Sequence, residues 1–150
     1  MKRRERADRP SPERWYQRAG GLAFECTACG RCCTGKSGYV WVGRREIDEL
    51  AGRLGLTLDE LGRRYLRRVG RAYALLERPV TGDCVFLDGT RCTVYDVRPS
   101  QCRAFPFWRR NVATPDAWEE TARACEGIRD DAPIVPASAI DAALEAARKA

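Results

Sequence analysis

Apolar residues recur at helical spacing in two consecutive segments of the first half of the chain. In the first, Ile47, Leu50, Ala51 and Leu54 predict a helix that Gly55 ends. The second begins at the capping-box pattern of residues 57–60, which can satisfy free amides at a helix start. Its apolar stripe comprises Leu58, Leu61, Tyr65, Leu66 and Val69, and its opposite face carries Arg63, Arg64, Arg67, Arg68 and Arg71. We therefore expect a helix pair whose second member has one continuous basic face.

Shorter runs of aromatic and β-branched residues predict strands. Residues 39–42 form one such run, and residues 72–76 form another. Residues 84–87 and 91–95 flank Asp88-Gly89, which is a strong turn signal. We expect a β-hairpin there, with Cys84 and Cys92 on neighbouring strands.

Prolines and capping residues mark the helices of the second half. A short helical turn is expected from Pro99, ending before Pro106, and a longer helix from Thr114-Pro115 to about Cys125. An extended segment at 132–136 precedes a last helix at 138–149.

Length and composition fit one small domain. The chain has 150 residues, of which 44% are hydrophobic and 32% charged. We predict an α+β domain over residues 15–150, with helices around a short antiparallel sheet or hairpin, after a basic flexible tail at 1–14. No secretory signal or membrane-spanning stretch is recognisable, so we expect a cytoplasmic protein.

Cysteines dominate the candidate chemistry. Four stand together in the run from Cys26 to Cys33, four more follow in the second half, and the chain has no histidine. Thiolates are soft ligands that select zinc, copper(I) or iron–sulfur clusters. A disulfide framework is disfavoured in the reducing cytoplasm, and burial as small hydrophobic residues does not explain four cysteines in eight positions. The candidate metal ligands are therefore Cys26, Cys29, Cys32, Cys33, Cys84, Cys92, Cys102 and Cys125.

The spacing of the clustered cysteines narrows the choice of metal. Cys26, Cys29 and Cys32 repeat the Cys-x-x spacing like the first three ligands of a bacterial ferredoxin. The fourth ligand of that pattern is missing, since Lys36 stands where a cysteine is needed. A distant cysteine must complete the site. We favour an iron–sulfur centre over zinc. Zinc remains the alternative, because eight cysteines also divide into two four-cysteine zinc sites.

Several spaced motifs agree in order with a known family. They are Phe24-Glu-Cys26 through Cys33, Cys84-Val-Phe-Leu, Cys92-Thr-Val-Tyr and the run from Arg98-Pro99 to Phe107. In these, roughly over residues 24–127, the chain resembles the CxxCxxCC cysteine-cluster family (YkgJ-like), described as zinc- or iron-chelating proteins. The resemblance implies a metal-binding domain and brings no settled reaction, so whether the chain is an enzyme is left open.

The residues around the cysteines suggest supporting roles. Arg98 and Arg103 could offset thiolate charge or donate to cluster sulfurs, or instead pair with Asp96 or a helix end. Tyr95, Phe105, Phe107 and Trp108 are expected to pack around the site as core.

A rival function comes from the charge of the chain. Its formal net charge is +6, and the basic helix face could neutralise nucleic-acid phosphates. The alternative is therefore a structural-zinc module that binds nucleic acid. Without histidine, a Ser-His-Asp or Cys-His catalytic site is excluded.

Overall fold

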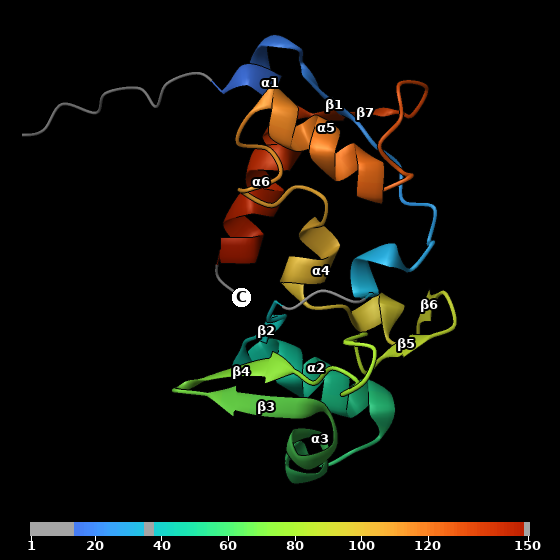
Figure 1. Ribbon diagram of the computed structural model, residues 1–150. Helices are drawn as coiled ribbons and strands as arrows, with labels where there is room; N and C mark the ends of the chain where they lie inside the picture. The colour runs from blue at the N-terminus through green and yellow to red at the C-terminus, as the bar shows by residue number, and fades with distance from the viewer. Residues whose placement is uncertain (1–13, 35–37, 149–150) are drawn as a thin grey trace, which may run out of the picture.

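The computed structural model describes residues 14–34 and 38–148, so the predicted tail at 1–14 lies almost wholly outside the described residues. The chain combines helices with short antiparallel strands, which confirms the α+β class. Figure 1 shows two layers of elements, with short helical segments between them. Each layer has its own hydrophobic core.

The lower core in Figure 1 lies between a three-stranded sheet and two helices. The sheet is antiparallel in the order β2 (Trp41–Val42), β4 (Ala72–Leu75) and β3 (Leu66–Val69). The helices are α2 (Arg44–Leu54) and α3 (Leu58–Tyr65). As the sequence predicts, Gly55 ends α2 in the left-handed conformation, and the Thr57 hydroxyl accepts from the Glu60 amide to begin α3.

The second predicted helix is shorter than its apolar stripe suggested. It ends at Tyr65, and Leu66–Val69 is strand β3, paired with β4 in the register Leu66↔Leu75 to Val69↔Ala72. Gly70, with φ of 62°, makes the tight turn between the two strands. This glycine is a turn signal in the sequence, but the helical spacing of the apolar residues before it favoured a helix. The expected continuous basic helix face therefore does not form, because Arg63 and Arg64 lie on α3 while Arg67 and Arg68 lie on β3.

The upper core gathers elements from both ends of the described chain. Strands β1 (Gly21–Ala23) and β7 (Ile134–Pro136) pair antiparallel, beside α1 (Trp15–Arg18), α5 (Pro115–Ala124) and α6 (Ala137–Arg148). Thr114 caps α5 and Pro115 occupies its first turn, as predicted. The buried side chains of this core are Tyr16, Leu22, Phe107, Val112, Trp118, Ile140 and Leu144.

The predicted hairpin is also shorter than expected. Strands β5 (Leu87–Asp88) and β6 (Arg91–Cys92) have two residues each, and Cys84 lies outside them in an isolated bridge with Glu77. The reason is a turn in which the Leu87 amide donates to the Cys84 carbonyl, so the chain from Cys84 to Phe86 bends and β5 begins only at Leu87. Cys84 and Cys92 are therefore not on neighbouring strands, although the Asp88-Gly89 turn is present.

Helix α4 (Ser100–Ala104) connects the two cores and follows the 3-10 turn η2 (Tyr95–Val97). It packs against α6 of the upper core. Toward the lower core, the Ser100 amide and hydroxyl both donate to Glu46 at 2.6 Å, and the Gln101 amide donates to the Tyr39 carbonyl. Glu46 is buried, so these bonds hold α4 firmly against the start of α2.

Within residues 14–34 and 38–148, no helix combines the length and the apolar character needed to cross a membrane.

Candidate metal centre

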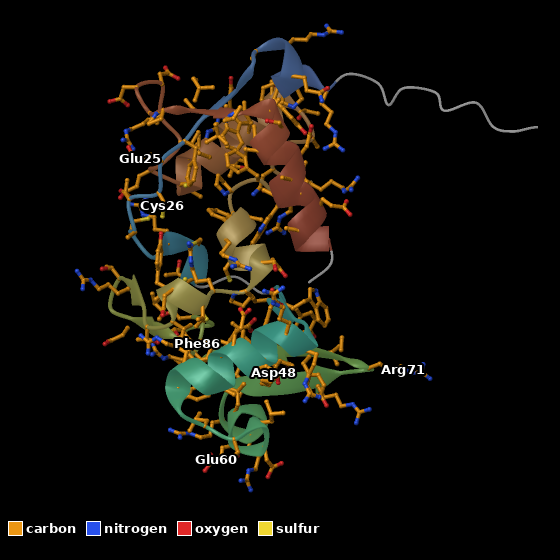
Figure 2. The ribbon with its side chains drawn as sticks, turned by 180° about the vertical axis from the view of Figure 1, so that it is seen from behind. Glu25, Cys26, Asp48, Glu60, Arg71 and Phe86 are labelled. Atoms are coloured by element: carbon orange, nitrogen blue, oxygen red, sulfur yellow. The ribbon has the colours of Figure 1, made fainter. Side chains whose placement is uncertain are left out.

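A cavity of about 280 Å³ opens between the two cores, and all eight cysteines line it. We call it the cysteine cavity. Most of its wall is apolar, and three arginines reach it. Figure 2 labels Cys26 on its upper side and Phe86 on its lower side. The structure thus brings the cluster Cys26–Cys33 together with all four distant cysteines. Besides the cysteines, its lining residues include Phe24, Arg31, Val40, Leu75, Phe86, Val94, Tyr95, Arg98, Pro99, Arg103, Phe105 and Trp108.

The first four cysteines lie on one loop, residues 26–33, which we call the cysteine loop. The loop continues from β1, and the Ala28 amide donates to Cys26 Sγ at 3.4 Å while Ala28 itself has φ of 56°. The 3-10 turn η1 (Arg31–Cys33) follows and places Cys32 Sγ 4.0 Å from Cys33 Sγ. Amide donors directed at a sulfur are typical of loops that hold a thiolate, because they stabilise its charge.

The distant cysteines come from four different elements. Cys84 stands in the bend before β5, Cys92 in β6, Cys102 in α4, and Cys125 at the C-terminal cap of α5. Cys26 and Cys32 are exposed, Cys125 is buried, and the other five are half-buried. All eight are free thiols, so no disulfide framework forms.

Backbone contacts fix the cysteine loop against the rest of the chain. The Glu25 amide donates to the Gly127 carbonyl at 3.0 Å, and the Cys84 amide donates to the Cys33 carbonyl at 2.8 Å. Gly30 has φ of 76°, and a Cβ there would lie 2.5 Å from the Thr90 carbonyl oxygen. The loop is therefore held from both sides, and at Gly30 only glycine fits.

The two adjacent cysteines of η1 influence one another strongly. With Cys33 as the donor, the S–H···S contact lowers the pKa of Cys32 to about 7, although burial opposes this, and the charge of Arg98 assists it. The same contact and burial raise the pKa of Cys33. One of the two is thus ready to act as a thiolate near neutral pH.

The thiols deeper in the cavity have raised pKa values. Burial raises the pKa of Cys102 to about 12, and neighbouring thiolates add to the rise. Burial is also the main cause of the raised pKa values of Cys84, Cys92 and Cys125. Burial thus keeps these thiols protonated on their own, and a bound cation would have to displace their protons.

The two predicted supporting arginines both line the cavity. The Nε of Arg98 donates to the Tyr95 carbonyl, and its guanidinium lies 3.7 Å from the centre of the Tyr95 ring. The alternative partner Asp96 instead pairs with Arg53, with an N–O distance of 2.9 Å. The positive charge of Arg103 contributes to the lowered pKa of Glu46, so it also acts on the α2–α4 junction.

Tyr95 differs from its expected role. It is 46% exposed and does not pack as core, and its hydroxyl lies 3.9 Å from Cys26 Sγ as a donor. Phe105 and Trp108 line the cavity and are half-buried. Phe107 is buried but does not line the cavity; it stacks on Trp118 in the upper core. The sequence did not predict that Tyr95 lies at the exposed edge of the cavity, because residues 92–95 fit a strand in which the ring would be buried.

The donor set fits a thiophilic metal. In the described part of the chain, no group of three or more Cys, Asp or Glu side chains is arranged to hold one ion. The thiols line the wall of the cavity without converging on one point. Their chemistry nevertheless matches zinc or an iron–sulfur cluster, since sulfur is the only soft donor present and carboxylates do not line the cavity. The apolar wall would limit the access of water to the deeper sulfurs of Cys84, Cys92 and Cys102.

Residues 25–126 match the model of the CxxCxxCC family, whose description reads "Putative zinc- or iron-chelating domain". An uncharacterized protein of Methanocaldococcus jannaschii, MJ0661, is 35% identical over 115 residues, which is 72% of this chain and 59% of the relative. The chain thus spans about three fifths of that relative's length. No solved structure matches the chain.

Proposed function

Because the chain belongs to the CxxCxxCC family of zinc- or iron-chelating domains, we propose that the thiols of the cysteine cavity hold an iron–sulfur centre used in redox chemistry. The observation that carries the proposal is the meeting of eight free thiols from five segments in one cavity. Metal binding holds whether the metal is zinc or iron, and the iron–sulfur cluster is the more specific proposal.

Three features favour iron–sulfur over zinc. Cys26, Cys29 and Cys32 keep the repeated Cys-x-x spacing on one loop. Arg31, Arg98 and Arg103 line the cavity, and a cluster held by thiolates carries net negative charge that such cations offset. The apolar wall also lowers the local dielectric, which is one way a protein sets a reduction potential.

The residues of the chain would divide the work as follows. The cysteines supply the ligands, and the Ala28 amide and Tyr95 hydroxyl donate to Cys26 Sγ. A bound cluster would supply one-electron transfer. Because Cys26 and Cys32 are exposed, the centre would lie close to the surface, where a protein or small-molecule partner can exchange electrons with it.

Zinc is the second candidate, supported by a different property of the same residues. Four-cysteine zinc sites need only sulfur, and eight cysteines provide two of them. Such a module would be structural. A nucleic-acid role for such a module would need another surface than one continuous basic helix face, because the arginines of that face are divided between α3 and β3. The free thiols also support a reducing compartment, and we place the protein in the cytoplasm as part of the proposal.

One experiment separates the two metals. The protein is produced and purified without oxygen, then analysed for iron, zinc and acid-labile sulfide, with absorption and paramagnetic resonance spectra. We expect a brown protein with equal amounts of iron and sulfide and broad absorption near roughly 400 nm. A colourless protein that holds only zinc would contradict the cluster and leave metal binding intact. A protein without either metal would contradict both.

A further inference from the structure

The hairpin of β3 and β4 carries positive charge away from the lower core. From Leu61 to Leu76 the chain has five arginines and no carboxylate. Figure 2 labels Arg71 at the far end of this hairpin, where its side chain points away from the rest of the molecule. Among the described residues, no ion pair or side-chain hydrogen bond involves Arg71. The end of the hairpin therefore presents an uncompensated cation to solvent.

One face of the hairpin changes from buried to exposed along its length. Leu66 and Leu75 lie opposite one another in the β3–β4 register, and both are buried in the lower core. Residues two positions further along each strand point to the same face. These residues are Arg68 and Tyr73, which are also opposite one another and are exposed, Tyr73 by 40%. The apolar face thus continues past the core as an arginine beside an aromatic ring.

Most of the hydrogen-bonding capacity of Arg68 is unused. Its Nε donates to the Gly70 carbonyl at 3.0 Å, and its two terminal nitrogens have no partner among the described residues. Arg67, on the opposite face of the sheet, is engaged, since it pairs with Glu77 at 3.2 Å and lies 5.2 Å from the centre of the Tyr39 ring. We call Arg68, Arg71 and Tyr73 the hairpin patch.

Exposed arginines also stand at the base of the hairpin, on the last turn of α3. They are Arg63 and Arg64. Arg63 pairs with Asp59 at 3.5 Å, but both side chains are largely exposed, so water weakens this pair. Since β3 has four residues, cations at its two ends lie roughly 13 Å apart along the strand. An extended anionic chain could follow the hairpin from its base to the hairpin patch.

We propose that the hairpin patch binds single-stranded nucleic acid, with phosphates on Arg68 and Arg71 and a base stacked on Tyr73. A guanidinium group donates two parallel hydrogen bonds to a phosphate, which suits the unused nitrogens of the two arginines. An exposed aromatic ring beside cations is a stacking surface for a base, which the carboxylates of an acidic protein would not use. The inference does not depend on the metal of the cysteine cavity.

The structure favours a single strand over a duplex. A base can stack on the Tyr73 ring only when it is not stacked within a double helix. A basic helix that could enter a major groove is not formed, because α3 ends at Tyr65 after eight residues.

Fluorescence anisotropy with labelled oligothymidylate and oligouridylate of about 12 nucleotides tests the proposal on the intact chain. We expect both strands to bind, and the logarithm of the binding constant to fall with the logarithm of salt by roughly 0.7 per contacted phosphate. The tighter of the two indicates DNA or RNA as the natural partner. No binding at low salt would overturn the proposal. Equal or tighter binding of polyglutamate, or of a duplex of the same length, would also overturn it.

A pair of double variants locates the binding surface. Arg68→Gln with Arg71→Gln should weaken binding by on the order of tenfold and reduce the salt slope by roughly 1.4, the value for two phosphates. The matched control is Arg109→Gln with Arg123→Gln, which removes the same charge from two other exposed arginines and should leave binding nearly unchanged. Equal losses in both double variants would show that net charge alone attracts the strand, and would contradict the proposal.

Substitutions of Tyr73 test the stacked base. Tyr73→Ala should bind about tenfold more weakly, whereas Tyr73→Phe keeps the ring and should bind like the intact protein. Unchanged binding by Tyr73→Ala would overturn the stacking role. Thermal unfolding of each variant shows whether the fold is kept. If Tyr73→Ala does not fold, the two double variants still decide, because their arginines are exposed.

Discussion

The Cys84 amide donates a 2.8 Å hydrogen bond to the carbonyl of Cys33. This bond joins the end of the cysteine loop to the bend before β5, so two thiols distant in the sequence become neighbours without relying on side-chain packing. A site held by main-chain bonds keeps its shape when a ligand side chain is changed, and this makes single cysteine substitutions informative.

Gly30 of the cysteine loop should not tolerate replacement by alanine. Gly30→Ala combines a left-handed φ with a Cβ that meets the Thr90 carbonyl. Gly89→Ala is the matched control, because Gly89 has φ of 61° and open space around it. We expect Gly89→Ala to cost about 1–2 kcal/mol, and Gly30→Ala to cost at least about 1 kcal/mol more because of the clash.

Chemical denaturation of the two variants, each loaded with metal, measures the difference in the free energy of unfolding. Equal losses of unfolding free energy in the two variants would show that the loop can move away from Thr90 without destabilising the fold.

The buried carboxylate of Glu46 should make stability depend on pH. Burial alone would raise its pKa, but hydrogen bonds from Ser100 and the Gly43 amide and the charge of Arg103 outweigh it, so the pKa lies below the ordinary value of 4.5. Glu46 thus stabilises the fold above that value, and this contribution is lost as the pH falls through the lowered pKa. At neutral pH we expect Glu46→Gln to cost about 1–3 kcal/mol.

The measurement is the difference in unfolding free energy between wild type and Glu46→Gln from pH 7 down to pH 3. It should shrink as the pH falls. Glu49→Gln, which removes a half-exposed carboxylate that pairs with Arg45 on the same helix, should show a difference of less than about 1 kcal/mol throughout. A Glu46→Gln difference that stays constant with pH would mean that Glu46 carries no charge in the fold.

Metal removal should destabilise the whole domain, because the cavity lies between the two hydrophobic cores. At free metal about a thousand times Kd, binding contributes about 4 kcal/mol, which corresponds to about 8–16 °C in Tm for a chain of this size. Thermal unfolding under reducing conditions, with and without a strong chelator, measures this. Identical curves for a sample verified as metal-free would argue against a structural role for the metal.

Arg98 should raise the reduction potential of the proposed cluster, because a nearby cation favours the more negative, reduced state. Replacing it by Gln removes an interaction on the order of 1 kcal/mol, which is on the order of 40 mV for one electron. Arg53→Gln is the control, since Arg53 pairs with Asp96 and does not line the cavity. A potentiometric titration should show a lower midpoint potential for Arg98→Gln alone. Equal potentials in all three proteins would exclude the arginine from tuning the centre.

Local signals in the sequence predicted most elements and their ends. Thr57, Gly55 and Thr114 act as caps at the predicted positions, because capping depends on a few neighbouring residues. The end of α3 could not be predicted in this way. Leu66 and Val69 fit a helical stripe equally well, and the competing strand pairing depends on Leu75 and Ala72 across a turn at Gly70.

The composition of the candidate site could be predicted, but not its architecture. The absence of histidine and the soft character of sulfur indicate the cysteines as candidate ligands from the sequence alone. Which thiols are neighbours depends on contacts such as Glu25 with Gly127, which joins the two ends of the domain and leaves no local pattern. The exposed position of Tyr95 likewise follows from the 3-10 turn η2, which replaced the expected strand.

The contact between residues 25 and 127 also sets an order of events during synthesis. The thiols of Cys26 and Cys29 leave the ribosome about a hundred residues before Cys125, which at about 5–20 residues per second is a delay of about 5–20 s. During that time the nascent chain carries reduced thiols without their distant partners. A metal site that includes Cys125 can therefore be completed only after nearly the whole domain has been synthesised.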